Sequence, residues 1–537
     1  MTLGASRSDR VALGAALVCF ALIAVTLELA AEEDAFIYYR YAWHWAHGRG
    51  LVFNPGDPVE GFSSPLWMGA LALLAWAGLD LPMTAPALGI VCGGATLVAA
   101  WWLGGTIGLS RSGRPTSLAA LAVSSPFIVW SRSGLETPFY SLAIVVTVAA
   151  YLAAEYPLRE DVRAWRWIGA LTLIVVCLGR PEGLLLAAVI LGDRLLDGRD
   201  WRGALHYGLP AAAVYGAFLV WRSHTFHSLV PNTTVKLYTL LVGRASSQAL
   251  EYVVYLGLLP LALPLLALWY RPRLARAERR RLGVLLSAVL LSFVFHFLAG
   301  GDYRQGFRFL VPTLPLVLVA IWYAFEVLGR QRGGRSGVLS SPLARVCLLV
   351  LVLAGPAAFL IQSPPRILDW RQRVFLSWRD PFSESGHWGV QVARWVGEHV
   401  PPNRVVAFGQ MGRVPYFAAR HGHDIRFIDT LGLVDREVSR IYRLDAKLLA
   451  FGRDVWNGRS LAQALEVGRL DRAQRAAASI LTRGPDVILM ETTLNDNRVK
   501  AMLLSSDFTQ CYREISASDR GGLPHVRVYA RDCGPAP

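Results

Sequence analysis

Two neighbouring acids, Glu33 and Asp34, follow an apolar run near the start of this 537-residue chain. They open the stretch EDAFIYYRYAWHWAHGRG, which is dense in aromatic residues. A carboxylate can accept the proton of a hydroxyl group while that hydroxyl attacks an electrophile. The pair is therefore a candidate general base.

Polar loops farther along the chain carry acids, arginines and a few amide or lysine side chains. These loops are VEGFSSPLW, SGLETPFY, RPEG, LVPNTTVK and GGDYRQGFRF; they hold Glu60, Glu136, Arg180, Glu182, Asn232, Lys236, Asp302 and Arg308. Charged groups at a membrane edge cost free energy, so a set of them on one face indicates a site. Arginine presents a planar fork of donors that suits phosphate. The pattern suits a phosphate-bearing lipid donor.

Several of these residues also have a purely structural explanation. Glu136 can interact with the dipole of the helix that it precedes. Arg180 and Glu182 can neutralise each other inside a helix bundle. Asn232 in PNTT is typical of a turn, and Asp302 after two glycines can cap one. The residues alone leave both explanations open.

Motifs for ATP or zinc chemistry are absent from the sequence, which has no Walker loop, no CxxC pair and no HExxH. The acids can bind a divalent ion through oxygen ligands, but no spacing demands one. We therefore predict no certain cofactor, and a divalent cation stays open.

The elements that must position these residues are membrane helices. The chain is 54% hydrophobic and 17% charged, against roughly 25% charged in a soluble domain. Its net charge is +15, but the basic residues fall in short clusters between apolar runs, as in cytoplasmic loops. This distribution predicts a polytopic protein in contact with membrane lipid and argues against a nucleic-acid partner.

The topology follows from the first apolar run, Val11 to Ala31, which spans about 31 Å as a helix. Basic residues before it place the N-terminus in the cytoplasm, so Glu33 and Asp34 emerge outside. Loops at 132–138, 224–236 and 300–308 should be external as well. We expect about ten to thirteen membrane helices. One of the segments 65–79 and 85–108 should not cross fully, since Arg111 and Arg114 would otherwise lie outside.

Two short apolar arms, 168–178 and 184–191, flank the sequence GRPEG. Each arm is too short to cross a bilayer without tilt or local thinning. We interpret them as a broken helix pair with Arg180 and Glu182 at its outer tip. Non-helical backbone at that depth is tolerated only where protein or water lines it.

The composition changes after residue 361, because no long apolar run follows. We predict a transmembrane domain at 1–361, with a long first outer loop at 32–64, and an extracytoplasmic α/β domain at 362–537. A helix should begin at Gly389, and strands should lie near RVVAFG, DIRFID, PDVILMET and 526–530. Cys511 and Cys533 are the only cysteines in this domain, where an oxidising compartment would let them bridge. Two free thiols is the alternative.

The order of these motifs resembles a known family. The run from Glu33 to Trp67 is similar to the first outer loop of bacterial GT-C membrane glycosyltransferases, in particular the branch of terminal β-(1→2)-arabinofuranosyltransferases. SGLETPFY, RPEG, LVPNTTVK and GGDYRQGFRFLVP resemble later motifs of that branch in the same order. DIRFIDTLGLVD resembles its external-domain signature, through Asp429, Leu431, Gly432, Leu433 and Asp435.

The resemblance implies transfer of a sugar from a polyprenyl-phosphate donor to a cell-envelope glycan or glycolipid acceptor, with inversion. Asp34 falls on the acidic pair as the preferred base, with Glu33 as its partner or an acceptor contact. The pair is commonly two aspartates, so Glu33 departs from the pattern. Arg180, Lys236 and Arg308 are the candidates for the donor phosphate.

Five further residues are candidates for sugar or acceptor hydroxyls: Glu60, Glu136, Glu182, Asn232 and Asp302. The resemblance also implies a multi-pass protein of the bacterial plasma membrane. Nothing in the sequence identifies the sugar, and arabinofuranose is one candidate among several.

Two other classes of function also fit intramembrane charges. A lipid or sugar transporter should show an internal repeat of its helix pattern, and the sequence has none. A non-catalytic wall-binding protein should tolerate Asp34→Asn, whereas the enzyme should not.

The aromatic stretch itself predicts a helix over about 34–47, ended by Gly48 and Gly50. Its aromatic side chains favour a helix that lies in the membrane interface. They can stack on sugar rings, although Trp43 and Trp45 are also typical of an interfacial belt.

Overall fold

The computed structural model describes most of the chain. The described residues are 7–26, 31–158, 163–196, 200–233, 242–256, 258–269, 274–302, 307–331, 343, 346–347, 349–350, 388–442, 457, 461–492, 497–515, 523 and 526–533.

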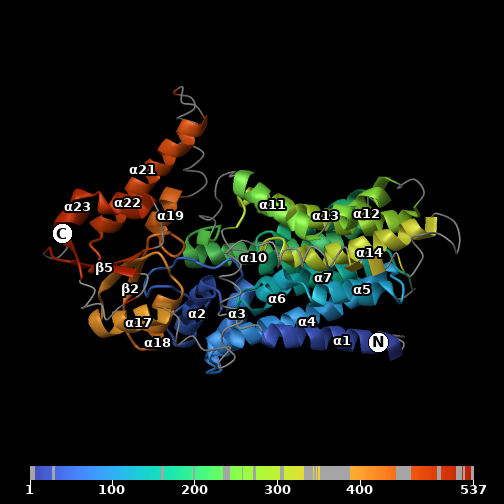
Figure 1. Cartoon of the computed structure of the whole chain (residues 1–537), viewed down its shortest axis with the longest axis horizontal. Coiled ribbons are helices and arrows are strands. Elements are labelled where there is room, and N and C mark those ends of the chain that lie inside the picture. The colour runs from blue at the N-terminus through green and yellow to red at the C-terminus, as the bar shows by residue number, and fades with distance from the viewer. Residues whose placement is uncertain are drawn as a thin grey trace.

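The N-terminal part is a bundle of apolar helices along the long axis of the molecule (Figure 1). Among the described residues, six helical segments are long and apolar enough to cross a membrane. They are α1 (Arg7–Thr26), α4 (Leu81–Ile107), α7 (Thr137–Glu155), α10 (Trp201–Phe226), α13 (Arg276–Leu298) and Val311–Leu328, which joins η3 (Val311–Thr313) to α14 (Leu314–Gln331). The protein is a multi-pass membrane protein, as predicted. The expected number of ten to thirteen membrane helices stays a prediction.

Shorter helices complete the bundle. They are α3 (Pro65–Trp76), α5 (Gly113–Ala122), α6 (Ser125–Arg132), α8 (Arg163–Gly179), α9 (Gly183–Leu196), α11 (Val242–Leu256) and α12 (Leu258–Trp269). The 12 residues of α3 reach only about 18 Å, so α3 does not cross. This confirms that one segment before Arg111 falls short of crossing. Helices α8 and α9 flank a turn at 180–182, which is the predicted tip.

The aromatic stretch forms α2 (Glu33–Ala46), and Gly48 and Gly50 follow it with positive φ. The position of this helix relative to the membrane stays a prediction, but several of its aromatic side chains face protein. Phe36 and Tyr39 are fully buried, because α18 (Arg413–Arg420) of the C-terminal region packs on them. Trp45 remains half-exposed. The aromatic residues therefore join the two parts of the molecule.

The C-terminal region is α/β, as predicted. Its described elements are α17 (Trp388–His399), β1 (Val405–Phe408), α18, β2 (Arg426–Asp429), α19 (Arg436–Tyr442), α21 (Leu461–Thr482), β3 (Val487–Glu491), α22 (Asn497–Leu503), α23 (Ser506–Cys511), β4 (Tyr512–Glu514) and β5 (Val526–Arg531). The strand order is β2-β1-β3-β5-β4. β1 pairs in parallel with β2 and β3, whereas β5 is antiparallel to β3 and β4. All four predicted strands are present. The predicted domain boundary at 361 lies outside the described residues.

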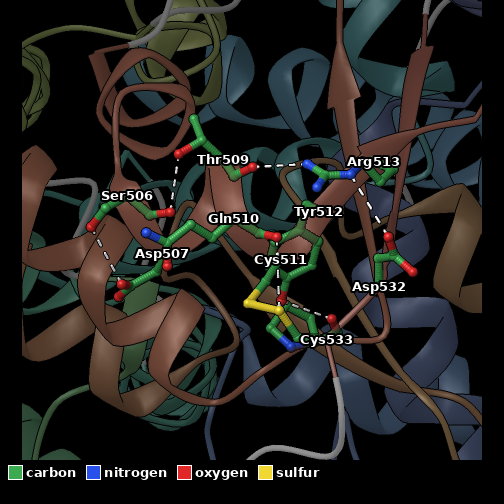
Figure 2. The surroundings of a disulfide bond; sticks show 10 residues. Ser506, Asp507, Thr509, Gln510, Cys511, Tyr512, Arg513, Asp532 and Cys533 are labelled. Carbon is green, nitrogen blue, oxygen red and sulfur yellow. Dashed lines mark hydrogen bonds and ion pairs between the residues drawn. A yellow bond between two sulfur atoms is a disulfide. The ribbon is translucent and has the colours of Figure 1, made fainter.

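Cys511 and Cys533 form a disulfide, which settles the pairing left open by the sequence (Figure 2). The bond ties the end of α23 to the chain just after β5. Arg513 and Asp532 lie beside it and form an ion pair. Such a bond is typical of proteins in oxidising compartments.

Candidate active site

A cavity of about 840 Å³ lies where the predicted outer loops meet. The cavity is lined by residues from α2, the loop before α3, the turn before α7, the α8–α9 tip, the loop after α10 and the chain around Arg308. The polar and charged lining residues are Asp34, Tyr38, Ser63, Glu136, Arg180, Glu182, Thr233 and Arg308. The structure thus brings together five of the predicted site residues from four separate motifs.

Asp34 lies in the first turn of α2 and is 9% exposed. Its Oδ2 is 3.2 Å from an Nη1 hydrogen-bond donor of Arg308. The same guanidinium group contacts Asp302, at 2.8 Å from Nε to Oδ2 and 3.3 Å from Nη2 to Oδ1. Asp302 is held from behind, because its backbone N–H donates to Gln248 Oε1 at 2.7 Å. Arg308 therefore bridges the candidate base and a second buried acid.

Arg180 forms a second buried cluster of charges. Its guanidinium group donates to both Glu136 and Glu182. The neutralising pair considered from the sequence is therefore real, and Glu136 joins it as a third member. Ser63 donates to Glu136 at 3.4 Å from Oγ to Oε1.

Phe309 connects the two clusters. The guanidinium carbons of Arg180 and Arg308 lie 5.6 Å and 5.2 Å from its ring centroid. Cations within about 6 Å of an aromatic ring are attracted by it. One ring thus holds two guanidinium groups next to each other at one end of the cavity.

A second cavity, of about 400 Å³, adjoins the first inside the bundle. The two cavities share Glu182, Phe295 and Phe309. Apart from Glu182, the second cavity is lined mainly by apolar side chains of α7, α9, α13 and η3, including Ile144, Leu186, Leu291 and Pro312. A charged cavity therefore lies next to a mainly apolar one among the membrane helices, with Glu182, Phe295 and Phe309 lining both.

Four predicted site residues do not line the charged cavity. Glu33 points to the C-terminal region, where its carboxylate contacts Gly412 and Arg413. Asp302 contacts Arg308 but is not part of the cavity lining. Glu60 and Asn232 line a separate polar cavity of about 540 Å³. A fifth, Lys236, lies outside the described residues.

Glu60 is almost fully buried and forms a two-point ion pair with Arg222 of α10, at 2.8 Å and 3.1 Å. Burial raises the pKa of Glu60 to about 7, although Arg222 acts in the opposite direction. The backbone carbonyl of Glu60 accepts from the backbone N–H of Asn232 at 2.9 Å. This bond ties the first outer loop to the loop after α10.

The signature DIRFIDTLGLVD forms a tight turn against these loops. Buried Asp429 accepts hydrogen bonds from the backbone N–H groups of Leu431, Leu433 and Val434 at 2.6–3.0 Å. Asn232 donates from Nδ2 to the carbonyls of Gly432 and Leu433, both at 2.9 Å. The turn places Leu433 in the wall of the charged cavity. The C-terminal region therefore contributes directly to the cavity.

Among the described residues, no group of three or more His, Cys, Asp or Glu side chains comes together as metal ligands would. Asp34 and Asp302 both contact the guanidinium group of Arg308. The divalent cation considered from the sequence stays a prediction.

Sequence reasoning missed three residues that hold the site. Arg222 pairs with Glu60, Arg413 pairs with Glu33, and Phe309 lies beside both cavity arginines. A charge one turn before the end of an apolar helix was a signal for Arg222. Arg413 had no comparable signal, because its partner is 380 residues away.

Curated relatives agree with the motifs. The chain is 26% identical over 321 residues to the terminal β-(1→2)-arabinofuranosyltransferase of Mycobacterium tuberculosis, covering 53% of this chain and 51% of the relative. The predicted resemblance is confirmed. A protein of the same name from Corynebacterium glutamicum is 23% identical over 350 residues, covering 53% of this chain and 47% of the relative. The chain spans about half the length of the curated relatives it matches.

A family described as a domain of unknown function (DUF8728) matches residues 379–529. This range holds every described element of the C-terminal region except the last residues of β5. The family description states no activity.

Solved structures show that the fold is of the GT-C type, as predicted. ArnT from Cupriavidus metallidurans bound to undecaprenyl phosphate has a TM-score of 0.52 at 15% identity, over 98% of both chains. The oligosaccharyltransferase AglB from Archaeoglobus fulgidus, in complex with an inhibitory peptide and a dolichol phosphate, has a TM-score of 0.53 at 12% identity. That match covers 98% of this chain and 75% of AglB.

Proposed function

We propose that the protein is a glycosyltransferase that moves a sugar from a polyprenyl-phosphate donor to a cell-envelope glycan or glycolipid. The observation that carries this proposal is the charged cavity that adjoins an apolar cavity among the membrane helices. A lipid-linked sugar phosphate has the same two chemical parts. The names of the curated relatives favour arabinofuranose as the sugar and agree with this class of reaction.

The donor phosphate is bound by Arg308 and Arg180 in this proposal. Both guanidinium groups flank Phe309 at the boundary between the two cavities. In the structure they pair with carboxylates, and a phosphate can present two of its oxygens to the same fork of donors. The phosphate takes Arg308 from Asp34, and the prenyl chain occupies the apolar cavity. Binding of the donor thereby releases the carboxylate that is needed as a base.

Asp34 then acts as the general base. The acceptor hydroxyl oxygen attacks the anomeric carbon of the sugar while its proton moves to the Asp34 carboxylate. The bond between the anomeric carbon and the phosphate oxygen breaks, and polyprenyl phosphate leaves with the electron pair. Attack opposite the leaving group inverts the configuration at the anomeric carbon.

The reaction lies on the outer face of the plasma membrane in this proposal, with the N-terminus in the cytoplasm and the C-terminal region outside. The disulfide in the C-terminal region supports this placement. Basic loops between the apolar runs support it independently. The acceptor then approaches from the aqueous side, where Leu433 and Thr233 line the cavity.

The test is a turnover assay with the full chain in detergent or lipid nanodiscs. Several polyprenyl-phosphate sugars are supplied with an envelope glycan acceptor, and released polyprenyl phosphate is measured by mass spectrometry. We expect release with one donor and a matching increase in the mass of the acceptor. A transporter would bind or move the lipid without releasing its phosphate. Binding without turnover by folded protein, with every donor, would contradict the proposal.

A further inference from the structure

The two neighbouring acids of α2 point to different parts of the molecule. Asp34 faces the cavity, where it contacts Arg308. Glu33 faces the N-terminal end of α18, where Oε1 accepts from the backbone N–H groups of Gly412 and Arg413, both at 2.9 Å. Its Oε2 lies 2.8 Å from Nη1 of Arg413. Successive helix residues differ by about 100° in direction, which allows this division.

Arg413 extends the contact along α2. Its side chain is 97% buried, and Nη2 donates to the carbonyl of Ala31. Its guanidinium carbon lies 4.5 Å from the ring centroid of Phe36. A single side chain of the C-terminal region therefore contacts α2 and its entry at residues 31, 33 and 36, on both sides of Asp34. Figure 1 shows α18 beside α2 at the junction of the two parts.

The approach of the two chains at this point is unusually close. A Cβ atom at Gly412 would lie 2.0 Å from the backbone oxygen of Glu33. Real Cβ contacts are never this short, so the position requires glycine. The sequence MGR at 411–413 is thus fitted to the first turn of α2.

We propose that Glu33 and Arg413 are positioning residues for Asp34, and that the external domain thereby sets the geometry of the base. This inference rests on the proposed function. The first turn of α2 is held on one side by α18 and on the other by the backbone bond from Glu32 N–H to Ser133 oxygen, at 2.9 Å. A general base must lie within hydrogen-bond reach of the hydroxyl that it deprotonates. A displacement of about 1 Å can cost roughly 100-fold in rate.

The experiment compares Glu33→Ala, Glu33→Gln and Asp80→Asn in the full chain. Glu33→Gln keeps an oxygen acceptor for the two backbone N–H groups but loses the charge pair. Asp80 pairs with Arg420 at the other end of α18 and is the matched control. That ion pair crosses the same junction but lies away from α2, with side chains 32% and 42% exposed.

Four quantities are measured for each variant: kcat, the KM for the donor, the Kd for undecaprenyl phosphate, and Tm. For Glu33→Ala we expect a loss in kcat of roughly 100-fold, with little change in the donor KM or the lipid-phosphate Kd. Glu33→Gln should recover part of the lost rate, and Asp80→Asn should match wild type. Wild-type kcat in Glu33→Ala would overturn the proposal. A proportional loss of kcat, lipid-phosphate binding and Tm would also overturn it, because that pattern indicates general destabilisation.

A second measurement is independent of turnover. Hydrogen–deuterium exchange of peptides that cover 31–40 should be faster in Glu33→Ala than in wild type, and unchanged in Asp80→Asn. Equal exchange in Glu33→Ala and wild type would overturn the proposal even if no donor were turned over. If wild type releases no lipid phosphate while exchange changes as expected, the proposed function fails and the coupling between the domains stands.

Discussion

The cavity and the junction with the C-terminal region hold their buried polar groups in different ways. In the cavity, acids pair with arginine side chains: Asp34 and Asp302 with Arg308, and Glu136 and Glu182 with Arg180. The junction also has ion pairs, Glu33 with Arg413 and Glu60 with Arg222, but many of its polar side chains bond to backbone groups. Examples are Glu33, Arg40, Asn54, Asn232, Asp429 and Arg436.

This difference indicates which region is built to change. A backbone N–H in a folded turn has no alternative position, so a side chain bonded to it is fixed in place. An ion pair between two side chains can be exchanged for a pair with a ligand of the same charge. The junction therefore acts as a frame, and the cavity holds its arginines ready for an anion.

The largest effect should come from Asp34→Asn, which tests the cavity. The amide has nearly the same shape as the carboxylate but cannot take up the acceptor proton. We expect a loss of roughly 10²- to 10⁴-fold in kcat, measured as release of polyprenyl phosphate. Tm should stay close to wild type, and lipid-phosphate binding should be equal or tighter, because Arg308 has lost a competing partner. Turnover near the wild-type rate would remove Asp34 from the mechanism.

The second prediction concerns the pH dependence of stability that a buried acid at the junction, Asp429, should cause. Burial raises the pKa of Asp429 to about 6 from its ordinary value of 3.8, although three backbone N–H donors act in the opposite direction. The folded state therefore binds more protons than the unfolded state between about pH 4 and pH 6. As the pH rises from about 4 to about 6, the free energy of unfolding should therefore fall by up to about 3 kcal/mol. Above pH 6, this group should cause no further change.

Asp429→Asn removes the titrating group and so provides the control for this prediction. The stability of wild type and variant is compared from pH 4 to pH 7 by pulse proteolysis of the full chain. The variant should show a shallower slope between pH 4 and pH 6, whatever its absolute stability. Parallel curves would mean that Asp429 does not titrate differently in the folded state.

A third prediction compares an arginine of the cavity, Arg308, with an arginine of the junction, Arg222, in their effect on lipid-phosphate affinity. Arg308→Lys keeps the charge but loses the planar fork that can bind a phosphate at two points. The affinity for undecaprenyl phosphate should fall roughly 30-fold, which corresponds to about 2 kcal/mol for charge-assisted hydrogen bonds. Arg222→Lys at the junction is the matched control and should leave this affinity unchanged. Equal losses of affinity in both variants would contradict the view that the cavity binds the phosphate and the junction only supports the structure.

The smallest effect should come from Asn54→Ala, which removes a junction contact remote from the cavity. Asn54 exchanges two hydrogen bonds with the backbone of Phe427, at 2.8 Å and 3.1 Å. We expect a loss of stability of about 1 to 2 kcal/mol, measured by denaturant unfolding, with lipid-phosphate affinity unchanged. A loss of that affinity instead would show that the junction and the cavity are not separate.

Much of the architecture could be predicted from the sequence because its signals are local. Runs such as VVAF and VILM fix their strands through apolar, β-branched composition. The short arms around GRPEG fix the tip that carries Arg180 and Glu182. The loops predicted to be external, which were identified from their charged residues, supply five residues of the cavity. These predictions needed only hydropathy, length and side-chain chemistry.

The features that could not be predicted from the sequence depend on contacts between distant parts of the chain. The aromatic residues of α2 looked interfacial because they are amphipathic and follow a membrane helix, but α18 covers them. Glu33 and Asp34 looked like an equivalent pair because they are adjacent. Their different directions become clear only when Arg413 is placed beside one and Arg308 beside the other. The sequence alone does not show which distant residue each of these acids contacts.

The most direct test of the central claim is a cryo-EM structure of the full chain with undecaprenyl phosphate. We expect the phosphate to contact Arg308 and Arg180 beside Phe309, Arg308 to have left Asp34, and the prenyl chain to lie in the apolar cavity. The contacts of Glu33 with Gly412 and Arg413 should be unchanged. A phosphate bound elsewhere, with Arg308 still paired to Asp34, would contradict the account.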